Sequence, residues 1–244
     1  MTENAYEAIA GRASILLLCD HASNALPPDC DGLGLPAGLF DTHIAYDIGA
    51  GCVTRTLARA YKAPALLGRW SRLLIDLNRG ADDPTLVMKL SDGSIIPGNR
   101  DVDALQVARR IAAYHAPYHG AITHELDRMG GQAVIVSIHS FTPVWKGVAR
   151  PWQLGILYAR DMRLARPLMR RLQDAGFIVG DNEPYSGALE GDTLWQHGIA
   201  RGLPHVLIEI RQDLIATDAM AQAFAARLKP ILDMALEDAK NPQE

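Results

Sequence analysis

The sequence predicts an α/β fold in which a mostly parallel sheet lies between layers of helices. Short runs that are apolar throughout alternate with longer segments of helical composition, which is typical of such a fold. Of the 244 residues, 48% are hydrophobic, enough for a sizeable core. This length suits one domain, and no repeat, low-complexity tract or charged linker divides the chain. We therefore expect a single domain over residues 1–244.

Six apolar runs predict strands. None of them alternates between polar and apolar residues, which indicates strands that are covered on both faces. The runs are residues 14–19, 63–67, 73–77, 133–138, 154–158 and 205–210.

Four segments between these runs predict helices, at residues 41–61, 101–129, 161–175 and 217–239. The first carries aliphatic residues at helical spacing, including Ile44, Ile48 and Leu57. The second is expected to bend or break at Pro117, because proline removes a helical hydrogen bond.

Charge and composition exclude several classes of protein. Lys and Arg number 24 and Asp and Glu 28, which gives a net charge of −4. This negative charge and the lack of a basic tract argue against a nucleic-acid-binding protein. The three cysteines, Cys19, Cys30 and Cys52, are odd in number and have no metal-binding spacing, which argues against a disulfide framework. No apolar run approaches the ~18 residues of a membrane span, and the first residues do not resemble a signal peptide. We expect a soluble, cytoplasmic protein of undetermined oligomeric state.

Polar residues stand where the predicted strands end. His21, Asn78 with Arg79, and His139 follow three of the runs, and Glu209 lies within the last run. Ligands of open α/β sheets bind beyond the carboxyl ends of strands. If these side chains meet, they supply metal ligands, an anion clamp and a base.

Other interpretations of the same residues remain open. A histidine after a strand can be a hydrogen-bonded loop residue, and Asn78 with Arg79 can form a turn with a solvated salt bridge. Glu209 is flanked by aliphatic residues, where an unpaired carboxylate is costly to bury. It therefore either pairs with an arginine such as Arg79 or Arg211, or takes part in chemistry.

Several segments resemble, in order, the motifs of the N-formylglutamate amidohydrolase family. The first is Cys-Asp-His-Ala-Ser-Asn-Ala-Leu-Pro at residues 19–27. The others are residues 71–79, 96–99, 117–119, 138–143, 182–186 and 208–214. The family is in turn similar to zinc carboxypeptidases and aspartoacylases. The resemblance thus implies a three-layer α/β/α sandwich with a mostly parallel central sheet, acting as a single catalytic domain with one zinc ion.

The resemblance also implies roles for individual residues. His21 and His139 would be zinc ligands, and Glu209 would be the general base. Asn78 and Arg79 would hold a substrate carboxylate. Arg72 would add a further donor to the substrate.

The third zinc ligand is the point where this sequence departs from those relatives. They carry a glutamate three positions after the first histidine, and here that position is Asn24, a poor zinc ligand. The resemblance favours Asp47, since family members carry an aspartate in the corresponding first helix. Asp47 lies four residues after His43, so both can share one face of the predicted helix. Alternatively, the two simply pair on the surface of that helix.

A second histidine pair, His115 and His119, also has metal-ligand spacing. Pro117 distorts the helix between them, and such an isolated pair is usually solvated. Because the resemblance includes residues 117–119, His119 is expected to contact the substrate or to support a residue that does. Residues 82–100, rich in Asp, Pro and Gly, are expected to form a loop over the site.

The resemblance implies hydrolysis of N-formyl-L-glutamate, or a close N-acyl amino acid, to formate and L-glutamate. Zinc-bound water would be the nucleophile and a small acidic N-acyl amino acid the partner. Two other functions stay open. One is a metallohydrolase of another N-acyl amino acid or a short peptide, and the other is a ligand-binding member without metal or activity.

Overall fold

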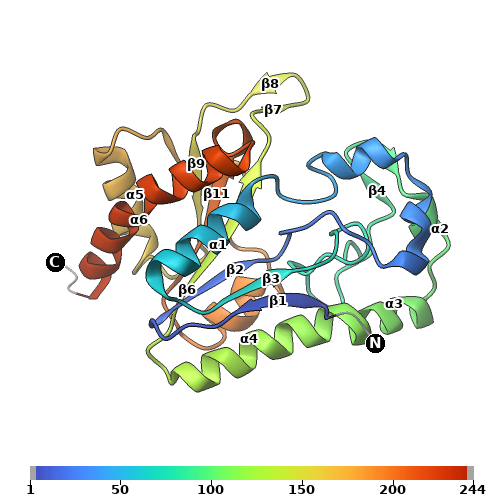
Figure 1. Ribbon diagram of the computed structural model, residues 1–244, viewed down its shortest axis with the longest axis horizontal. Helices are drawn as coiled ribbons and strands as arrows, with labels where there is room; N and C mark the ends of the chain where they lie inside the picture. Colours follow the sequence, from blue (N-terminus) through green and yellow to red (C-terminus); the bar gives the residue numbers. More distant parts are fainter. Residues whose placement is uncertain (1–3, 241–244) are drawn as a thin grey trace.

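A computed structural model describes residues 4–240 and contains a central seven-stranded sheet (Figure 1). Its strands lie in the order β1-β3-β2-β6-β11-β9-β10. Their bounds are β1 Tyr6–Ile9, β2 Ile15–Cys19, β3 Ala65–Gly68, β6 Val134–Phe141, β9 Leu154–Leu157, β10 Val179–Asp181 and β11 His205–Arg211. Two short hairpins stand apart from the sheet, formed by β4 Leu90–Ser91 with β5 Ser94–Ile95 and by β7 Val144–Trp145 with β8 Val148–Ala149.

The centre of the sheet is parallel, as predicted. Strands β3, β2, β6 and β11 run in one direction. Strand β9 pairs antiparallel to β11 and parallel to β10, and β1 pairs antiparallel to β3. The register places Glu209 of β11 between His139 of β6 and Gly155 of β9.

Helices cover both faces of the sheet, which confirms the three-layer architecture (Figure 1). One face packs against α1 Ala50–Tyr61, α5 Ala165–Asp174 and α6 Asp218–Lys240. The other packs against α4 Ala116–Met129, which α3 Ala104–Arg110 precedes. Strand β2 is buried on both sides, because Leu17 faces the first cluster and Leu16 and Leu18 the second. Its unbroken apolar run is thereby explained.

The predicted strand at residues 73–77 is wrong. These residues form turns, although all of them are buried. Leu74 and Leu77 pack in the core cluster beneath α4, and Leu73 belongs to a third, smaller cluster. An apolar run reports burial, and burial alone does not distinguish a strand from a packed loop. Strands β1 and β10, of four and three residues, were not predicted.

The first predicted helix begins nine residues later than expected, at Ala50. Gly49 has a φ of 79°, and a Cβ there would lie 2.2 Å from the Ile215 carbonyl oxygen. This left-handed residue separates the preceding loop from α1. Residues 42–49 are therefore not helical, and the helix face expected to be shared by His43 and Asp47 does not exist.

The helical segment from Ala104 to Met129 is distorted near Pro117 but stays continuous. A capping box of Asp103 and Gln106 begins α3, and a π-helical turn, Ile111–His115, joins it to α4. In that turn the Ala116 N–H donates to the Ile111 carbonyl. A π turn just before a proline accommodates the hydrogen bond that the ring removes.

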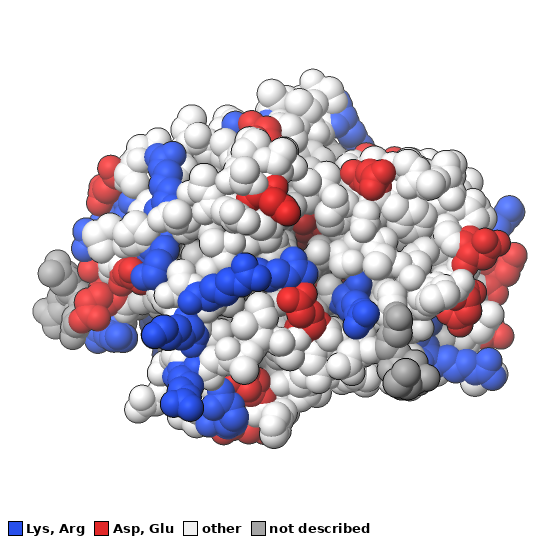
Figure 2. Space-filling view, viewed as in Figure 1, with Lys and Arg blue, Asp and Glu red and all other residues white. Residues whose placement is uncertain are grey.

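Basic and acidic side chains lie near one another over the face drawn in Figure 2. Several of them form ion pairs, for example Arg55 with Glu7 at 2.6 Å and Arg171 with Asp238 at 2.8 Å. Within residues 4–240, none of the helices combines the length and the apolar character needed to cross a membrane.

Candidate active site

A pocket of about 280 Å³ lies where β2, β6 and β11 end. It contains seven of the eight residues to which the sequence assigned a role, and these come from distant parts of the chain. They are His21, Asp47, Arg72, Asn78, Arg79, His139 and Glu209. Parallel strands bring their carboxyl ends to one edge of a sheet, which explains why His21, His139 and Glu209 meet. The other four residues reach the pocket from loops.

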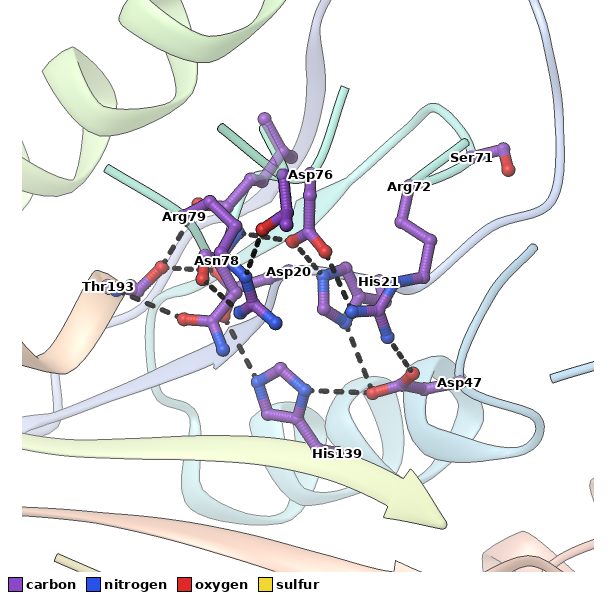
Figure 3. Close-up of polar contacts among 12 residues, drawn as sticks. Asp20, His21, Asp47, Ser71, Arg72, Asp76, Asn78, Arg79, His139 and Thr193 are labelled. Atoms are coloured by element: carbon purple, nitrogen blue, oxygen red, sulfur yellow. Dashed lines mark hydrogen bonds and ion pairs between the residues drawn. The ribbon is translucent and has the colours of Figure 1, made fainter. Parts of the chain in front are cut away.

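His21, Asp47 and His139 form a compact, buried group that could hold a metal ion. Their possible ligand atoms all lie within 4.8 Å of one another. The Asp47 Oδ2 atom is 3.4 Å from His21 Nδ1 and 2.8 Å from His139 Nδ1, and both rings point toward it (Figure 3). Ligand atoms around a tetrahedral zinc lie about 3.3 Å apart. Two imidazole nitrogens and a carboxylate oxygen at these separations fit zinc.

The opposite nitrogen of each ring faces another carboxylate. His21 Nε2 lies 2.7 Å from Asp76 Oδ1, and His139 Nε2 lies 3.1 Å from Asp20 Oδ2 (Figure 3). Nε2–H groups that donate to these carboxylates leave the Nδ1 lone pairs directed at Asp47. Metal-binding histidines are commonly oriented by a carboxylate in this manner.

When no cation is bound, a proton must lie between each ring nitrogen and the carboxylate oxygen that it faces. Burial by itself lowers the pKa of His139, but its hydrogen bonds to Asp20 and Asp47 and their charges raise this pKa well above the usual value. Burial raises the pKa of Asp47, yet the His21 and His139 rings bring this pKa below its ordinary range. The group therefore strongly attracts positive charge.

Sequence reasoning missed Asp20 and Asp76 as members of the site. The Tyr118 hydroxyl donates to Asp20 at 2.7 Å, and the Thr193 hydroxyl at 3.0 Å. The Arg72 guanidinium donates to Asp76 at 2.7 Å. Both aspartates lie inside the motifs that carry the family resemblance, so their adjacency to His21 and Asn78 was the available signal.

Asp47 and Asn24, the two residues considered for the third ligand position, lie in different surroundings. Asn24 does not line the pocket, and its amide donates to the Phe40 carbonyl at 2.8 Å. Asp47 lies in the loop before α1, and its Oδ2 accepts weakly from the Ser140 N–H at 3.4 Å. His43 also lines the pocket, and its Nε2 lies 3.2 Å from Asp92.

Within residues 4–240, Glu209 has no ion pair with an arginine. Arg211 bonds to Asp213, and Arg79 has its nearest acidic neighbour, Asp83, at 4.0 Å. The Glu209 Oε2 atom is buried and makes no hydrogen bond with residues 4–240. Burial raises the pKa of Glu209 to about 7, against opposing charge from His139. A buried acid with such a pKa is suited to proton transfer at neutral pH.

Arg79 and Asn78 both present donors to the pocket. Arg79 uses Nη1 on the Asn78 carbonyl at 2.8 Å and Nε on Thr85 at 3.3 Å. Its Nη2 has no hydrogen-bond partner within residues 4–240. Asn78 accepts the Thr193 N–H at 3.0 Å through Oδ1, which leaves its amide N–H groups available.

Arg72 also lines the pocket, but its guanidinium is engaged. It lies 2.7 Å from Asp76 and 3.5 Å from Asp47. These two carboxylates raise its pKa against the effect of burial. The guanidinium therefore holds Asp76 and Asp47 in place. Its expected contact with the substrate stays a prediction.

His119 does not line the pocket, so its position does not support a direct contact with substrate. It lies behind the pocket wall, with Nε2 3.0 Å from the Leu77 carbonyl. Residues 82–100, expected to be a loop, contain the β4–β5 hairpin and the short helix α2 Pro97–Arg100, and their residues Met88, Ser91 and Asp92 line the pocket. That segment therefore forms one of its walls.

Comparison with known proteins gives three findings. The model of the N-formylglutamate amidohydrolase family matches residues 13–216. The structure of a gene product from Agrobacterium tumefaciens has 34% sequence identity and a TM-score of 0.92, over 97% of this chain and 96% of that one. An N-formylglutamate amidohydrolase from Ralstonia eutropha JMP134 shares the fold, with 19% identity, a TM-score of 0.69 and 97% of each chain covered. No curated protein matches the chain.

Proposed function

The chain belongs to the N-formylglutamate amidohydrolase family, and from this premise we propose that it hydrolyses N-formyl-L-glutamate, or a close N-acyl amino acid, to formate and L-glutamate. The observation that carries the proposal is the buried group of His21, Asp47 and His139 beside the unpaired Glu209. Residues 1–244 would act as a single catalytic domain.

His21 and His139, through Nδ1, and Asp47, through Oδ2, would hold a zinc ion. Three protein ligands leave a position open for water or substrate, as catalytic zinc sites require. When bound, zinc polarises a carbonyl group and lowers the pKa of water to about 7. Asp20, Asp76 and the Arg72 guanidinium would keep the ligands in place through the contacts described above.

Glu209 would act as the general base and then as the general acid. Its carboxylate takes a proton from the attacking water and passes that proton to the departing amine nitrogen. Among the described residues 4–240, Oε2 of Glu209 has no hydrogen-bond partner, which supports this role because the group has no competing contact to break.

Arg79 and Asn78 would bind a carboxylate of the substrate. A guanidinium offers two parallel N–H donors that match a carboxylate, which a lysine cannot do. The volume of about 280 Å³ suits a ligand the size of an acylated amino acid.

Metal analysis and a formate-release assay test the proposal together. We expect about one zinc per chain, release of formate from N-formyl-L-glutamate, loss of this activity on chelation and its return with zinc. N-acetyl and N-succinyl amino acids serve as competing substrates. Absence of hydrolysis of every substrate by the zinc-loaded protein would refute the proposed function.

Two substitutions test the ligand assignment. His21→Ala and His139→Ala should each lose zinc and turnover, because two remaining ligands hold the ion poorly. His124→Ala is the matched control, since His124 is exposed on α4 and should retain both. Full zinc content in either ligand variant would show that the metal lies elsewhere.

A further inference from the structure

The segment that carries Asn78 and Arg79 is buried but belongs to no strand or helix. Its backbone carbonyls therefore lack the partners that regular structure would provide, and buried carbonyls without partners are strongly unfavourable. Two of them accept hydrogen bonds from histidines. His119 Nε2 lies 3.0 Å from the Leu77 oxygen, and His115 Nε2 lies 2.9 Å from the Arg79 oxygen.

A third buried histidine extends this arrangement. His197 belongs to the π-helical segment Trp195–Ile199, and its Nε2 lies 2.9 Å from His119 Nδ1. The His119 and His197 rings are nearly parallel, with an interplanar angle of 13° and centroids 5.2 Å apart, so they lie edge to edge as their hydrogen bond requires. His115 packs against His119 with ring centroids 4.2 Å apart. The three rings thus form one cluster behind the wall of the pocket.

The proton positions in this cluster follow from its hydrogen-bond acceptors. A carbonyl oxygen can only accept, so His119 must carry its proton on Nε2. Burial lowers the pKa of His119 to about 3 and that of His197 to about 4, which keeps both rings neutral. His119 Nδ1 is then an acceptor, and His197 must donate from Nε2. Only this set of tautomers satisfies both hydrogen bonds.

The segment before His197 also contacts the segment that carries Asn78 and Arg79. The Thr193 N–H donates to the Asn78 side-chain oxygen at 3.0 Å, and its hydroxyl lies 3.3 Å from the Leu77 carbonyl. Gly191 and Gly80 approach closely, since a Cβ on Gly191 would lie 3.2 Å from the Gly80 Cα. Residues 191–197 are therefore packed directly against the segment that carries Asn78 and Arg79.

We propose that His197 and His119 form a hydrogen-bond relay that positions Asn78 and Arg79 for binding the substrate carboxylate, with His115 holding the Arg79 carbonyl. The inference rests on the proposed function of the clamp. None of the three histidines lines the pocket, so they are positioning residues. Their loss should weaken substrate binding and spare the metal and the chemical step.

The test compares substitutions that remove or keep the donor. His119→Leu should raise KM for N-formyl-L-glutamate about tenfold and leave kcat within about threefold, with zinc content unchanged. His119→Gln places an amide N–H near the position of ring Nε2 and should return KM to within about threefold of the wild type. His197→Leu, which removes the outer link, should give a smaller rise in KM than His119→Leu. His124→Leu on the same helix is the control.

A ring-nitrogen NMR spectrum of the wild-type protein tests the relay without activity. It should show His119 and His197 protonated at Nε2 and unprotonated at Nδ1, and His115 protonated at Nε2. A proton on Nδ1 of His119 would overturn the relay, as would an unchanged KM in a folded His119→Leu protein. If the wild type releases no formate, the proposed function fails, and the spectrum still decides the relay. The spectrum of the wild-type protein also tests the relay if the His119→Leu protein does not fold.

Discussion

Glu209 differs from Asp20 and Asp76, two other buried acids of the site, in its partners. Asp20 and Asp76 are held by hydrogen-bond donors, and their pKa values lie below the usual range despite burial. Glu209 has no donor on Oε2 within residues 4–240, and burial raises its pKa to about 7. This contrast separates Asp20 and Asp76, which hold the site together, from Glu209, which can exchange a proton.

Glu209→Gln should therefore bind zinc normally and lose turnover by a factor of about 10² or more, because an amide cannot accept the proton. In the wild type, the active form is the ionised carboxylate, so kcat/KM should fall as the pH drops below about 7. The measurements are zinc content and a pH–rate profile. Unchanged turnover of the variant would remove Glu209 as the base.

Arg79→Lys should weaken substrate binding by about 2 kcal/mol, close to 30-fold in KM, because a lysine cannot form the paired hydrogen bonds. Zinc content should not change. Arg69→Lys is a suitable control, since Arg69 is exposed and outside the pocket. Substrate affinity that stays at the wild-type level in Arg79→Lys would refute the clamp.

At the scale of the element, the site depends on where regular structure stops. Gly49 ends the loop that carries Asp47 before α1 begins. The turns at residues 73–77 place Asp76 against His21 and lead Asn78 and Arg79 to the pocket. Strand β9 shows a related constraint. Gly155 lies opposite Glu209, and a Cβ on it would lie 1.9 Å from the Glu183 carbonyl oxygen.

Gly155→Ala should destabilise the protein by about 2 kcal/mol or more, because the obstacle is backbone that must shift. Gly120→Ala provides the contrast, since Gly120 is exposed on α4 with nothing within 4 Å of the added Cβ. That change should stabilise the protein by about 0.5–1 kcal/mol through helix propensity. Denaturant unfolding of both variants checks the prediction, and equal stabilities would contradict it.

At the scale of the whole molecule, the buried neutral histidines tie stability to pH. The pKa of His197 is about 4 in the folded protein and near 6.5 once unfolded. As the pH falls through 6.5, the unfolded state binds a proton that the folded state does not. Stability from this group is thus present at neutral pH and is lost on acidification.

His197→Gln, which cannot titrate, should reduce the loss of unfolding free energy between pH 7 and pH 4.5 by about 2 kcal/mol. Equilibrium unfolding at both pH values provides the measurement. His124→Gln should leave the slope unchanged, since that histidine is exposed. A slope in His197→Gln equal to that of the wild type would mean that His197 is already protonated in the folded state.

Much of the layered fold could be predicted because its signals are local. Five of the six apolar runs are strands, and the segments expected to be helical contain α1, α3 with α4, α5 and α6. The failures occur where tertiary contacts override local pattern. Residues 73–77 are buried by packing against two clusters, and the loop before α1 is set by Gly49 against Ile215, 166 positions away.

The layers of the fold and several side chains at strand ends could be predicted from the sequence, because local patterns specify them, and the order of the motifs indicated the family. The folded structure was needed to bring Asp47 next to His21 and His139, to show that Asp20 and Asp76 orient those rings, and to place His119 behind the pocket. These contacts join residues 26, 55 and 92 positions apart in the chain. Local periodicity carries no information about such separations, because they arise only when the sheet and its loops are packed together.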